Sequence, residues 1–259
     1  MELGLRGKTA VVTGGSRGIG FETARAFLQE GANVAICGRD TIALDEAREK
    51  LSPLGNVLAI KADATSRVDM ERFALKTAQH FGGLYCWVNN VGASIKRAGE
   101  QYTPEEIRKT VAVCFESAVY GCQSAFKYMK DTGGAIVNVS SLAARCGTAG
   151  RSTLYGPLKA AVRELAVMFA AEYAAYNIRV NTVLPGFTMT PTVERTISSE
   201  ELAYNEEGTL LRRMAKPEEI AWPIVFLCSN KASYITATSL EVSGGRSVVL
   251  NPGFSYGED

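Results

Sequence analysis

The sequence is poor in histidine, since only His80 occurs among its 259 residues. His80 ends a helical pattern and is followed by Phe81 and two glycines, which indicates a position at a helix C-terminus, where the helix dipole favours it. A Ser-His-Asp triad built on any other histidine is therefore excluded. A zinc site is not expected either, because no cluster of ligands surrounds this one histidine.

Cysteine occurs six times but never in a C-x-x-C pair. Cys37 and Cys86 lie in strand-like apolar runs. We therefore expect reduced thiols that are mostly buried, with neither a disulfide framework nor a metal site.

Excess charge and long apolar runs are absent as well. The chain has 28 basic and 27 acidic residues, a net charge of +1, which argues against a nucleic-acid or membrane-surface partner. No apolar run approaches membrane length, and the first residues lack the basic-then-apolar pattern of a signal sequence. The cytoplasm is the expected location.

What the sequence does contain is an alternation of strand-like and helical patterns. Strands are predicted at Thr9–Val12, Asn33–Cys37, Val57–Ile60, Leu84–Val88, Ala135–Val139, Ile178–Val183 and Leu240–Val242. Helices are predicted at Phe21–Leu28, Ile42–Leu51, Val68–Phe81, Thr103–Asp131 and Tyr155–Ala175, and from Pro217 onward. This order predicts an α/β fold: a doubly wound, mostly parallel seven-stranded sheet with helices on both faces. No linker interrupts it, so residues 1–259 are expected to form one domain.

Residues 186–216 depart from this alternation, because they mix Thr, Ser and Glu with scattered apolar side chains. Two interpretations stand side by side. The segment is either a plain surface excursion or a mobile lid over a site. The last residues, from Arg246 to Asp259, are more than a sheet terminus needs, and their apolar side chains indicate that they dock over the site or against a neighbouring copy.

The glycine-rich stretch Thr13–Gly20 follows the first predicted strand and precedes the first helix. Strand, glycine loop and helix together are typical of a site for a dinucleotide pyrophosphate. Glycines let the backbone approach the ligand, and the helix start offers unpaired N–H groups to phosphate.

The end of the second strand indicates which dinucleotide fits. An acid there would bind the ribose hydroxyls of NAD and repel a 2′-phosphate, but this position is Gly38, followed by Arg39. Arg17 in the glycine loop could reach the same phosphate, and two guanidinium groups suit a dianion. Asp40 argues the other way, although its offset suits a helix cap better. The pattern favours NADP(H) over NAD.

Tyr155 and Lys159 lie four residues apart on a predicted helix and so share a face. A nearby ammonium is expected to lower the pKa of the phenol from near 10 toward working pH. Such a tyrosine gives a proton to a carbonyl oxygen during reduction, or takes one from an alcohol during oxidation.

Taken together, these motifs resemble the short-chain dehydrogenase/reductase family, of the classical type, along nearly the whole chain. The matching pieces are the glycine loop Thr13–Gly20, Asp63–Ala64, Asn89–Gly92, Ser140–Ser141, Tyr155–Lys159, and Pro185–Gly186 with Thr190 beyond. The resemblance implies a Rossmann fold, an oxidoreductase activity, and a dimer or tetramer packed through the long helices near Cys114 and Tyr155. It also implies that residues 186–216 are the substrate lid.

The resemblance also implies residue roles. Tyr155 is the expected general acid/base, Lys159 binds the nicotinamide ribose and tunes Tyr155, and Ser141 binds the substrate oxygen. The expected cofactor-binding residues are Gly14, Ser16, Arg17, Gly18, Ile19, Gly20, Arg39, Asp63, Ala64, Asn90, Gly92, Tyr155, Lys159, Pro185, Gly186, Thr188 and Thr190.

Three features depart from the family pattern. Cys114 stands where the family usually has an asparagine of a proton-relaying water chain, and a thiol is a poor donor and acceptor. Pro157 lies between Tyr155 and Lys159, which is tolerable only in a first helical turn. Ser141 lies one residue further from Tyr155 than is usual, and Ser140 is the alternative, since adjacent strand residues point oppositely.

Two hypotheses of function follow. The first is an NADP(H)-dependent oxidoreductase that interconverts a ketone and a secondary alcohol, with a small, apolar or ring-bearing substrate. Arg97, Arg145 and Arg151 are candidates to meet a substrate carboxylate. The second is a catalytically weakened cofactor-binding sensor or scaffold of the same fold, for which Cys114 is the support.

Overall fold

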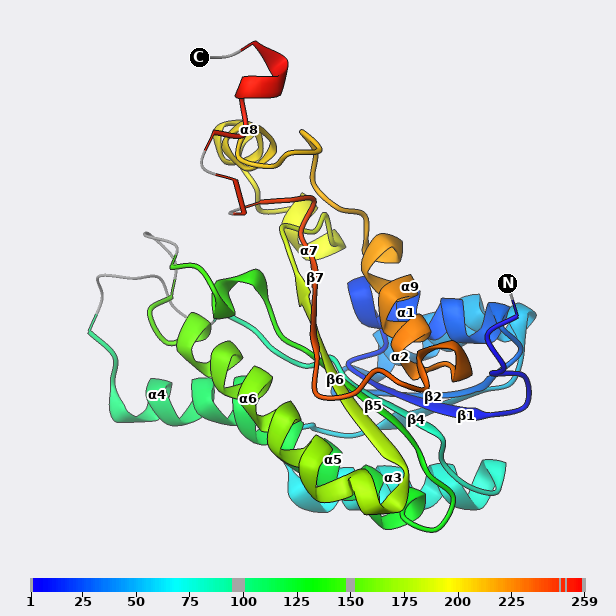
Figure 1. Cartoon of the computed structure of the whole chain (residues 1–259). Helices are drawn as coiled ribbons and strands as arrows, with labels where there is room; N and C mark the ends of the chain where they lie inside the picture. The colour runs from blue at the N-terminus through cyan, green and yellow to red at the C-terminus, as the bar shows by residue number, and fades with distance from the viewer. Residues whose placement is uncertain (1, 95–100, 148–151, 247, 250, 258–259) are drawn as a thin grey trace.

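Seven short apolar runs form one parallel sheet in the computed structural model, which describes residues 2–94, 101–147, 152–246, 248–249 and 251–257. The strands are β1 (Thr9–Thr13), β2 (Asn33–Gly38), β3 (Val57–Lys61), β4 (Cys86–Asn89), β5 (Gly134–Val139), β6 (Ile178–Pro185) and β7 (Ser239–Val242). Their spatial order is β3-β2-β1-β4-β5-β6-β7 (Figure 1). The predicted α/β class is confirmed.

Helices cover both faces of the sheet. α1 (Gly18–Gln29), α2 (Thr41–Leu51) and α9 (Pro217–Cys228) pack on one face, while α3 (Arg67–Phe81), α5 (Ser117–Met129) and α6 (Tyr155–Tyr173) pack on the other (Figure 1). Alternate strand residues feed two separate cores: Val12 lies under α1 and α9, whereas Val11 and Trp87 lie under α3, α5 and α6. Because both faces of the sheet are buried, the strands appear in the sequence as continuous apolar runs.

The predicted helix from Thr103 to Asp131 is interrupted. Thr103 caps α4 (Pro104–Val111) in a capping box with Glu106, and a π-helical turn at Ala112–Glu116 then separates α4 from α5. Cys114 lies in this turn and is buried. The π turn leaves no trace in the hydrophobic period, so the sequence pattern merges the two helices.

Residues 186–216 contain two short helices, α7 (Pro191–Glu194) and α8 (Ser199–Glu207), rather than irregular chain throughout. They form part of a lobe that stands above the rest of the molecule in Figure 1, and the last helical turn, Phe254–Tyr256, lies against that lobe. The remaining short elements are 3-10 turns at Ser52–Leu54, Leu142–Ala144, Ala174–Tyr176 and Asn230–Ala232. None of the helices in the described ranges is long and apolar enough to cross a membrane.

A buried polar network ties β4 to β5 beneath the site. The Trp87 indole donates to Asn89 Oδ1 at 2.7 Å, and Asn89 Nδ2 donates to Asn138 Oδ1 at 2.8 Å. Gly121 of α5 makes room for it, because a Cβ at that position would overlap Asn89 Oδ1. The absence of a side chain at position 121 therefore allows α5 to pack this closely on the sheet.

The substitution Gly121→Ala tests this packing. We expect the free energy of unfolding to fall by about 1–3 kcal/mol, because α5 or the network must move despite the higher helix propensity of alanine. Urea unfolding followed by circular dichroism measures it, with Gly147→Ala as the control, since a Cβ at Gly147 meets no atom within 4 Å. Equal stability of the two variants would contradict the packing argument.

Candidate functional site

The candidate site lies at the carboxyl edge of the parallel sheet, where the loops after β1, β4, β5 and β6 meet. This edge is where parallel α/β sheets bind ligands. The glycine loop follows β1, Asn90 and Gly92 follow β4, Ser140 and Ser141 follow β5, and Gly186 follows β6. Topology therefore gathers motifs that lie far apart in the sequence.

The glycine loop adopts backbone conformations that require glycine. Gly14 and Gly18 have φ values of 64° and 54°, and a Cβ at Gly20 would overlap the carbonyl of Gly14. Asn90 Nδ2 donates to the carbonyl oxygens of Thr13 and Gly14, at 3.2 Å each, which fastens the loop to the end of β4. α1 then starts with neither a side-chain cap nor an acid in its first turn, so its N–H groups suit a phosphate.

A cavity of about 630 Å³ runs along this loop. Ser16, Arg17 and Gly18 line one part of it, and Met189 and Pro191 from the start of residues 186–216 line another. The residue between these two, Thr190, lies so close that a Cβ on Gly18 would be 3.2 Å from its Cγ2. The glycine loop and the start of residues 186–216 are thus neighbours. The side chain of Ile19 packs against the core instead, which leaves its backbone for any ligand contact.

Both carboxylate oxygens of Asp40 contact protein groups. One carboxylate oxygen accepts from Ala43 N at 3.2 Å and caps α2, and the other meets Arg17 Nη2 at 2.6 Å. The expected helix-capping role is therefore present. Gly38 leaves open space at the end of β2, since the nearest atoms to an added Cβ lie at 3.7 Å.

Asp63 lies at the far end of this region. Its Oδ1 accepts from the backbone N and the hydroxyl of Thr65, at 2.9 and 2.8 Å. Its Oδ2 lies 4.0 Å from Arg39 Nη1, and Ala64 beside it is buried. Arg39 itself is largely exposed, so its guanidinium is free to turn toward a ligand at the mouth of the site.

Tyr155, the first residue of α6, is hydrogen-bonded to the side chain of Ser141. Ser140 points the other way and donates to the carbonyl of Lys159 at 2.7 Å. The two serines therefore have different tasks: Ser141 lies at the phenol, and Ser140 holds α6 against β5. Pro157 lies in the first turn of α6, where no backbone N–H is needed.

Lys159 is 3% exposed, and its ammonium donates to the carbonyl oxygen of Val139 at 2.8 Å. Its Nζ lies 6.0 Å from the ring centroid of Tyr155. Gly92 allows this position, because a Cβ there would overlap Nζ. Lys159, Tyr155 and Ser141 thus occupy one site, bounded by the loops after β4 and β5.

The expectation that Lys159 lowers the pKa of Tyr155 is wrong for the protein groups alone. Burial raises the pKa of Tyr155 to about 12, outweighing the hydrogen bond from Ser141, which lowers it. Burial also lowers the pKa of Lys159 to about 8. The physical reason is that desolvation acts on both groups, while the ammonium is turned toward Val139.

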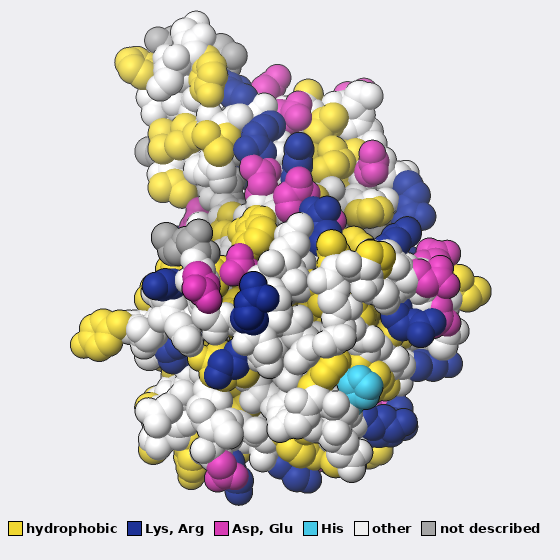
Figure 2. Space-filling model, turned by 90° about the vertical axis from the view of Figure 1, so that its right-hand side faces the viewer, with side chains coloured by type: hydrophobic (Ala, Val, Ile, Leu, Met, Phe, Trp, Pro, Cys, Tyr) yellow, Lys and Arg dark blue, Asp and Glu magenta, His cyan; other side chains and the backbone are white. Residues whose placement is uncertain are grey.

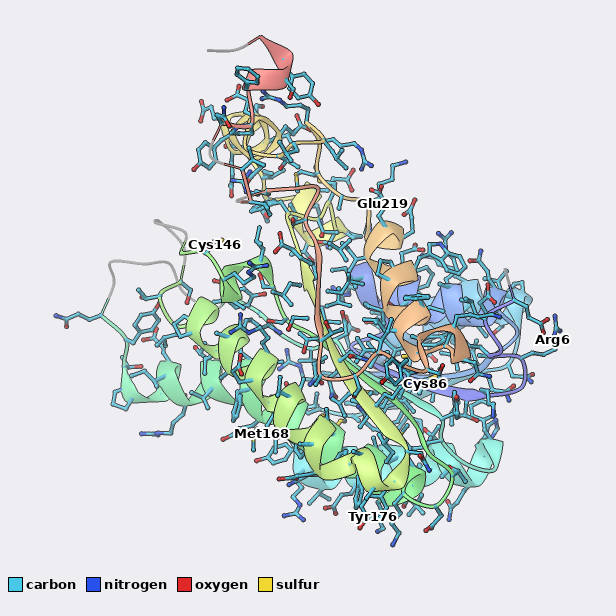
Figure 3. All side chains as sticks on the ribbon, in the orientation of Figure 1. Arg6, Cys86, Cys146, Met168, Tyr176 and Glu219 are labelled. Carbon is cyan, nitrogen blue, oxygen red and sulfur yellow. The ribbon has the colours of Figure 1, made fainter. Side chains whose placement is uncertain are left out.

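Cys114 lies close to both groups. Its thiol donates to the carbonyl of Ala93 at 3.1 Å, which ties the π turn to the loop after β4. A thiolate at Cys114 would raise the pKa values of Tyr155 and Lys159, so it lies within electrostatic reach of each. All six cysteines are free, and Figure 3 shows buried Cys86 within the core and half-exposed Cys146 below the upper lobe.

Arg145 already has an acidic partner. Its Nη1 donates to Glu241 Oε2 at 2.8 Å, and Ser243 donates to the other oxygen of Glu241 at 2.6 Å. Arg97 and Arg151, the other two candidates for a substrate carboxylate, lie outside the described residues. Sequence reasoning missed Glu241, although an acid inside the apolar run Leu240–Val242 was a usable signal.

Some backbone and hydroxyl groups of the site were not predicted. The carbonyl of Val139 accepts from Lys159, and the hydroxyl of Thr13 accepts from Asn90 N at 3.0 Å. Among the predicted residues, Thr188 donates to the carbonyl of Gly186 at 3.1 Å, close to where β6 ends at Pro185. Carbonyl acceptors carry no side-chain signal, so only the folded structure identifies them.

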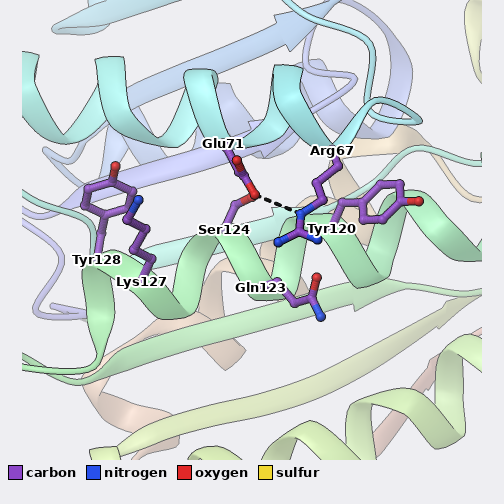
Figure 4. Close-up of a pocket in the computed structure, with 7 residues that line it drawn as sticks. All are labelled: Arg67, Glu71, Tyr120, Gln123, Ser124, Lys127 and Tyr128. Carbon is purple, nitrogen blue, oxygen red and sulfur yellow. Dashed lines mark hydrogen bonds and ion pairs between the residues drawn. The ribbon is translucent and has the colours of Figure 1, made fainter.

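A second cavity, of about 270 Å³, lies between α3 and α5 and is remote from this chemistry (Figure 4). Its lining includes Arg67, whose Nε donates to Glu71 at 2.8 Å, and none of Ser141, Tyr155 or Lys159. Among the described side chains, no three of His, Cys, Asp or Glu gather as metal ligands.

Comparison with known proteins agrees with this geometry. A family model described as enoyl-(acyl carrier protein) reductase matches residues 14–247. An NADP-dependent (R)-specific alcohol dehydrogenase of Lentilactobacillus kefiri is 33% identical, covering 93% of this chain and 97% of that protein. A tropinone reductase homologue of Arabidopsis thaliana is 35% identical, covering 97% and 96%.

Solved structures agree as well. The complex of Pseudomonas aeruginosa RhlG with NADP superposes with a TM-score of 0.89 at 29% identity, covering 94% of this chain and 98% of that one. A short-chain type dehydrogenase/reductase from Mycobacterium marinum gives a TM-score of 0.91 at 29% identity, covering 96% and 98%. The chain belongs to the short-chain dehydrogenase/reductase family, whose members are oxidoreductases.

The buried ammonium of Lys159 makes stability depend on pH. Below pH 8 the folded and unfolded chains both carry the proton, and burial of the charge costs free energy. Between the folded pKa of about 8 and the ordinary lysine pKa of 10.5, only the unfolded chain keeps the proton, so the cost falls as pH rises. We expect Lys159→Met to be more stable than wild type at pH 7 by about 1–3 kcal/mol, and the gap to shrink by pH 9.5.

Urea unfolding at both pH values measures this gap, with exposed Lys50→Met as the control for loss of a surface charge. Buried phenols and thiols oppose this pH dependence of stability. Wild type and Lys159→Met share those groups, so their contribution cancels in the difference between the two free energies of unfolding. A gap that stays constant from pH 7 to pH 9.5 would contradict the assigned cost.

Proposed function

We propose that the protein is an NADP(H)-dependent oxidoreductase that interconverts a ketone and a secondary alcohol by hydride transfer. The observation that carries this proposal is the group of Ser141, Tyr155 and Lys159 at the sheet edge, beside the glycine loop. A sensor or scaffold would have no need to keep a phenol and a hydroxyl beside a buried ammonium in one site.

The proposed chemistry assigns one task to each side chain. Ser141 donates a hydrogen bond to the substrate oxygen, beside Tyr155. Tyr155 gives its proton to that oxygen during reduction and takes a proton from the alcohol during oxidation. The high pKa of Tyr155 keeps the phenol protonated at neutral pH, which suits reduction. The nicotinamide group of the cofactor, when bound, supplies or accepts the hydride.

Proton exchange with solvent differs from what an asparagine at position 114 would give. The thiol of Cys114 is occupied by the carbonyl of Ala93, so it adds no strong acceptor beside Lys159. Lys159 instead donates to Val139. In this proposal a proton reaches Tyr155 through water at the open side of the site.

The proposed cofactor site runs along the carboxyl edge of the sheet. The pyrophosphate is held by the glycine loop and the start of α1, the adenine lies near Asp63 and Ala64, and the nicotinamide ribose lies near Lys159 and Asn90. The full proposed set is Gly14, Ser16, Arg17, Gly18, Ile19, Gly20, Arg39, Asp63, Ala64, Asn90, Gly92, Tyr155, Lys159, Pro185, Gly186, Thr188 and Thr190. The glycines a side chain would block and the uncapped helix start support this fit.

Three observations support NADP(H) over NAD. Gly38 offers no carboxylate at the end of β2. Asp40 caps α2 through Ala43 N and pairs with Arg17, which offsets its negative charge near the end of β2. In this proposal Arg17 and Arg39 both contact the 2′-phosphate, because two guanidinium groups suit a dianion. The NADP-dependent relative and the NADP complex among the structural matches agree with this choice.

The substrate we propose is a small, apolar or ring-bearing ketone or alcohol, closed in by residues 186–216. We also propose a homo-oligomer, a dimer or tetramer, packed through α5 and α6. Apolar side chains left exposed on and after α6, Met168 at 60% and Tyr176 at 42%, support that contact.

Tyr155→Phe tests the central assignment. The variant keeps the ring but cannot move a proton, so we expect kcat for ketone reduction to fall by about 10³-fold or more while the Kd for NADPH stays unchanged. Tyr176→Phe removes a hydroxyl beyond the end of α6 and serves as the control. Undiminished turnover in Tyr155→Phe would refute the assignment of Tyr155 as the general acid/base.

Arg39→Ala tests the cofactor choice. We expect the Kd for 2′,5′-ADP to rise by about tenfold or more, because a charge-assisted contact with the phosphate is lost, while the Kd for 5′-AMP barely changes. Isothermal titration calorimetry measures both. Equal weakening of the two ligands would show that Arg39 does not recognise the 2′-phosphate.

A further inference from the structure

The segment after β7 crosses residues 186–216 and contacts them through two cation–π pairs, with the arginine in a different segment in each pair. Here the tail is the described part of residues 246–257, and the lid is residues 186–216. Arg246 of the tail lies over the ring of Tyr204 in α8, 5.5 Å from its centroid, and Arg212 of the lid lies over the ring of Tyr256 in the tail, at 4.6 Å. Each segment thus supplies one cation and one aromatic ring to the other.

The C-terminal end of α8 depends on these arginines. The helix has acids in its first turn but no basic residue in its last turn. Arg246 donates to the carbonyl of Asn205 at 2.6 Å, and Arg212 donates to the carbonyl of Glu207 at 3.0 Å. Cations at a helix C-terminus satisfy its last carbonyls and oppose its dipole. One of the two caps therefore comes from outside the lid.

Two further hydrogen bonds extend this pairing. Leu211 N donates to the carbonyl of Gly244, just before the tail, at 3.2 Å, and the Tyr256 hydroxyl of the tail donates to the carbonyl of Leu210 at 2.8 Å. Gly208 lets Arg246 approach, because a Cβ there would lie 2.6 Å from Nη1. The tail follows the lid from the end of the sheet to the last helical turn, as Figure 1 shows.

The lid has a firm stem but a weakly buried tip. At the stem, Met189 N and Ala215 N make backbone bonds of 2.8 and 2.9 Å, and Arg213 forms two 2.6 Å bonds with Glu219, labelled in Figure 3. At the tip, Asn205 is the one fully buried residue of α8. A nine-residue helix with so little burial is marginal without added contacts.

The lobe made by the lid and the tail is rich in exposed apolar side chains. Hydrophobic groups gather on the upper part of the molecule in Figure 2. Tyr204 is 67% exposed and Tyr256 is 53% exposed. Burial in a core therefore contributes little to keeping α8 in place. Its contacts are the Ser198 cap at its start, and the arginine caps, ring contacts and hydrogen bonds to the tail at its end.

We propose that the tail is a strap that keeps α8 folded, with Arg246 and Tyr256 as positioning residues for the lid. Substrate affinity then depends on the tail, although neither residue touches the reacting atoms. The effect on substrate rests on the proposed function, whereas the effect on the folding of α8 does not.

Hydrogen–deuterium exchange of the full-length protein tests the strap. In Arg246→Ala we expect the amides of Tyr204–Leu211 to exchange about tenfold faster, because a charge-assisted cap is lost. Arg246→Lys, which keeps the charge, should exchange at an intermediate rate. Tyr256→Ala should behave like Arg246→Ala. Tyr234→Ala, which removes a fully exposed tyrosine elsewhere, should match wild type.

Two further measurements separate positioning from other roles. With NADPH and acetophenone as the probe ketone, KM should rise about threefold or more in Arg246→Ala while kcat changes less. The Kd for 2′,5′-ADP should stay at the wild-type value, because the cofactor site lies below the lid.

Unchanged exchange in both Arg246→Ala and Tyr256→Ala would overturn the strap. A raised KM with wild-type exchange would also overturn it, because Arg246 would then act on the substrate directly. Absence of wild-type turnover with every ketone tested would contradict the proposed function alone, and the exchange rates would still decide the role of the tail.

Discussion

The buried ammonium of Lys159 is the interaction on which the rest of the site depends. It joins α6 to the carbonyl of Val139 at the end of β5, and it reaches this position only because Gly92 has no side chain. Ser140 adds a second bond between β5 and α6, to the carbonyl of Lys159 itself. With α6 fixed at these points, Tyr155 is held beside Ser141. This arrangement costs free energy, because the charge of Lys159 is buried.

Burial sets the protonation of the two titratable groups of the site. A phenol whose pKa is raised to about 12 stays protonated at neutral pH, so little phenolate is present to act as a base. Oxidation of an alcohol requires the phenolate, so it needs positive charge near Tyr155 beyond what the protein groups provide. Lys159, with its pKa lowered to about 8, loses part of its charge in mildly alkaline solution.

Much of the fold could be predicted from the sequence, because strands buried on both faces and amphipathic helices leave strong patterns. All seven strands and the glycine loop were visible in this way, and so was the cap at Asp40. The π turn at Cys114 was not, because one extra residue per turn does not disturb the apolar pattern. The two helices of the lid were hidden as well, since short helices with little burial need no apolar period.

The candidate site divides in the same way. Side chains within motifs, such as Tyr155 and Ser141, could be predicted, and the choice between Ser140 and Ser141 required the strand geometry. The pKa of Tyr155 could not be predicted, because it depends on how far burial outweighs a neighbouring charge. The hydrogen bond from Arg246 to α8 joins segments about 40 residues apart, so no local sequence pattern predicts it.

We propose that the site transfers hydride from NADPH to a ketone while Tyr155 supplies the proton. The most direct measurement uses NADPH deuterated at the transferring carbon and a panel of prochiral aromatic ketones, with the products analysed by mass spectrometry and chiral chromatography. The account predicts an alcohol of one hand that carries a single deuterium on its carbinol carbon, formed by wild type. Products without deuterium, or no product from any ketone or in the reverse direction, would contradict it.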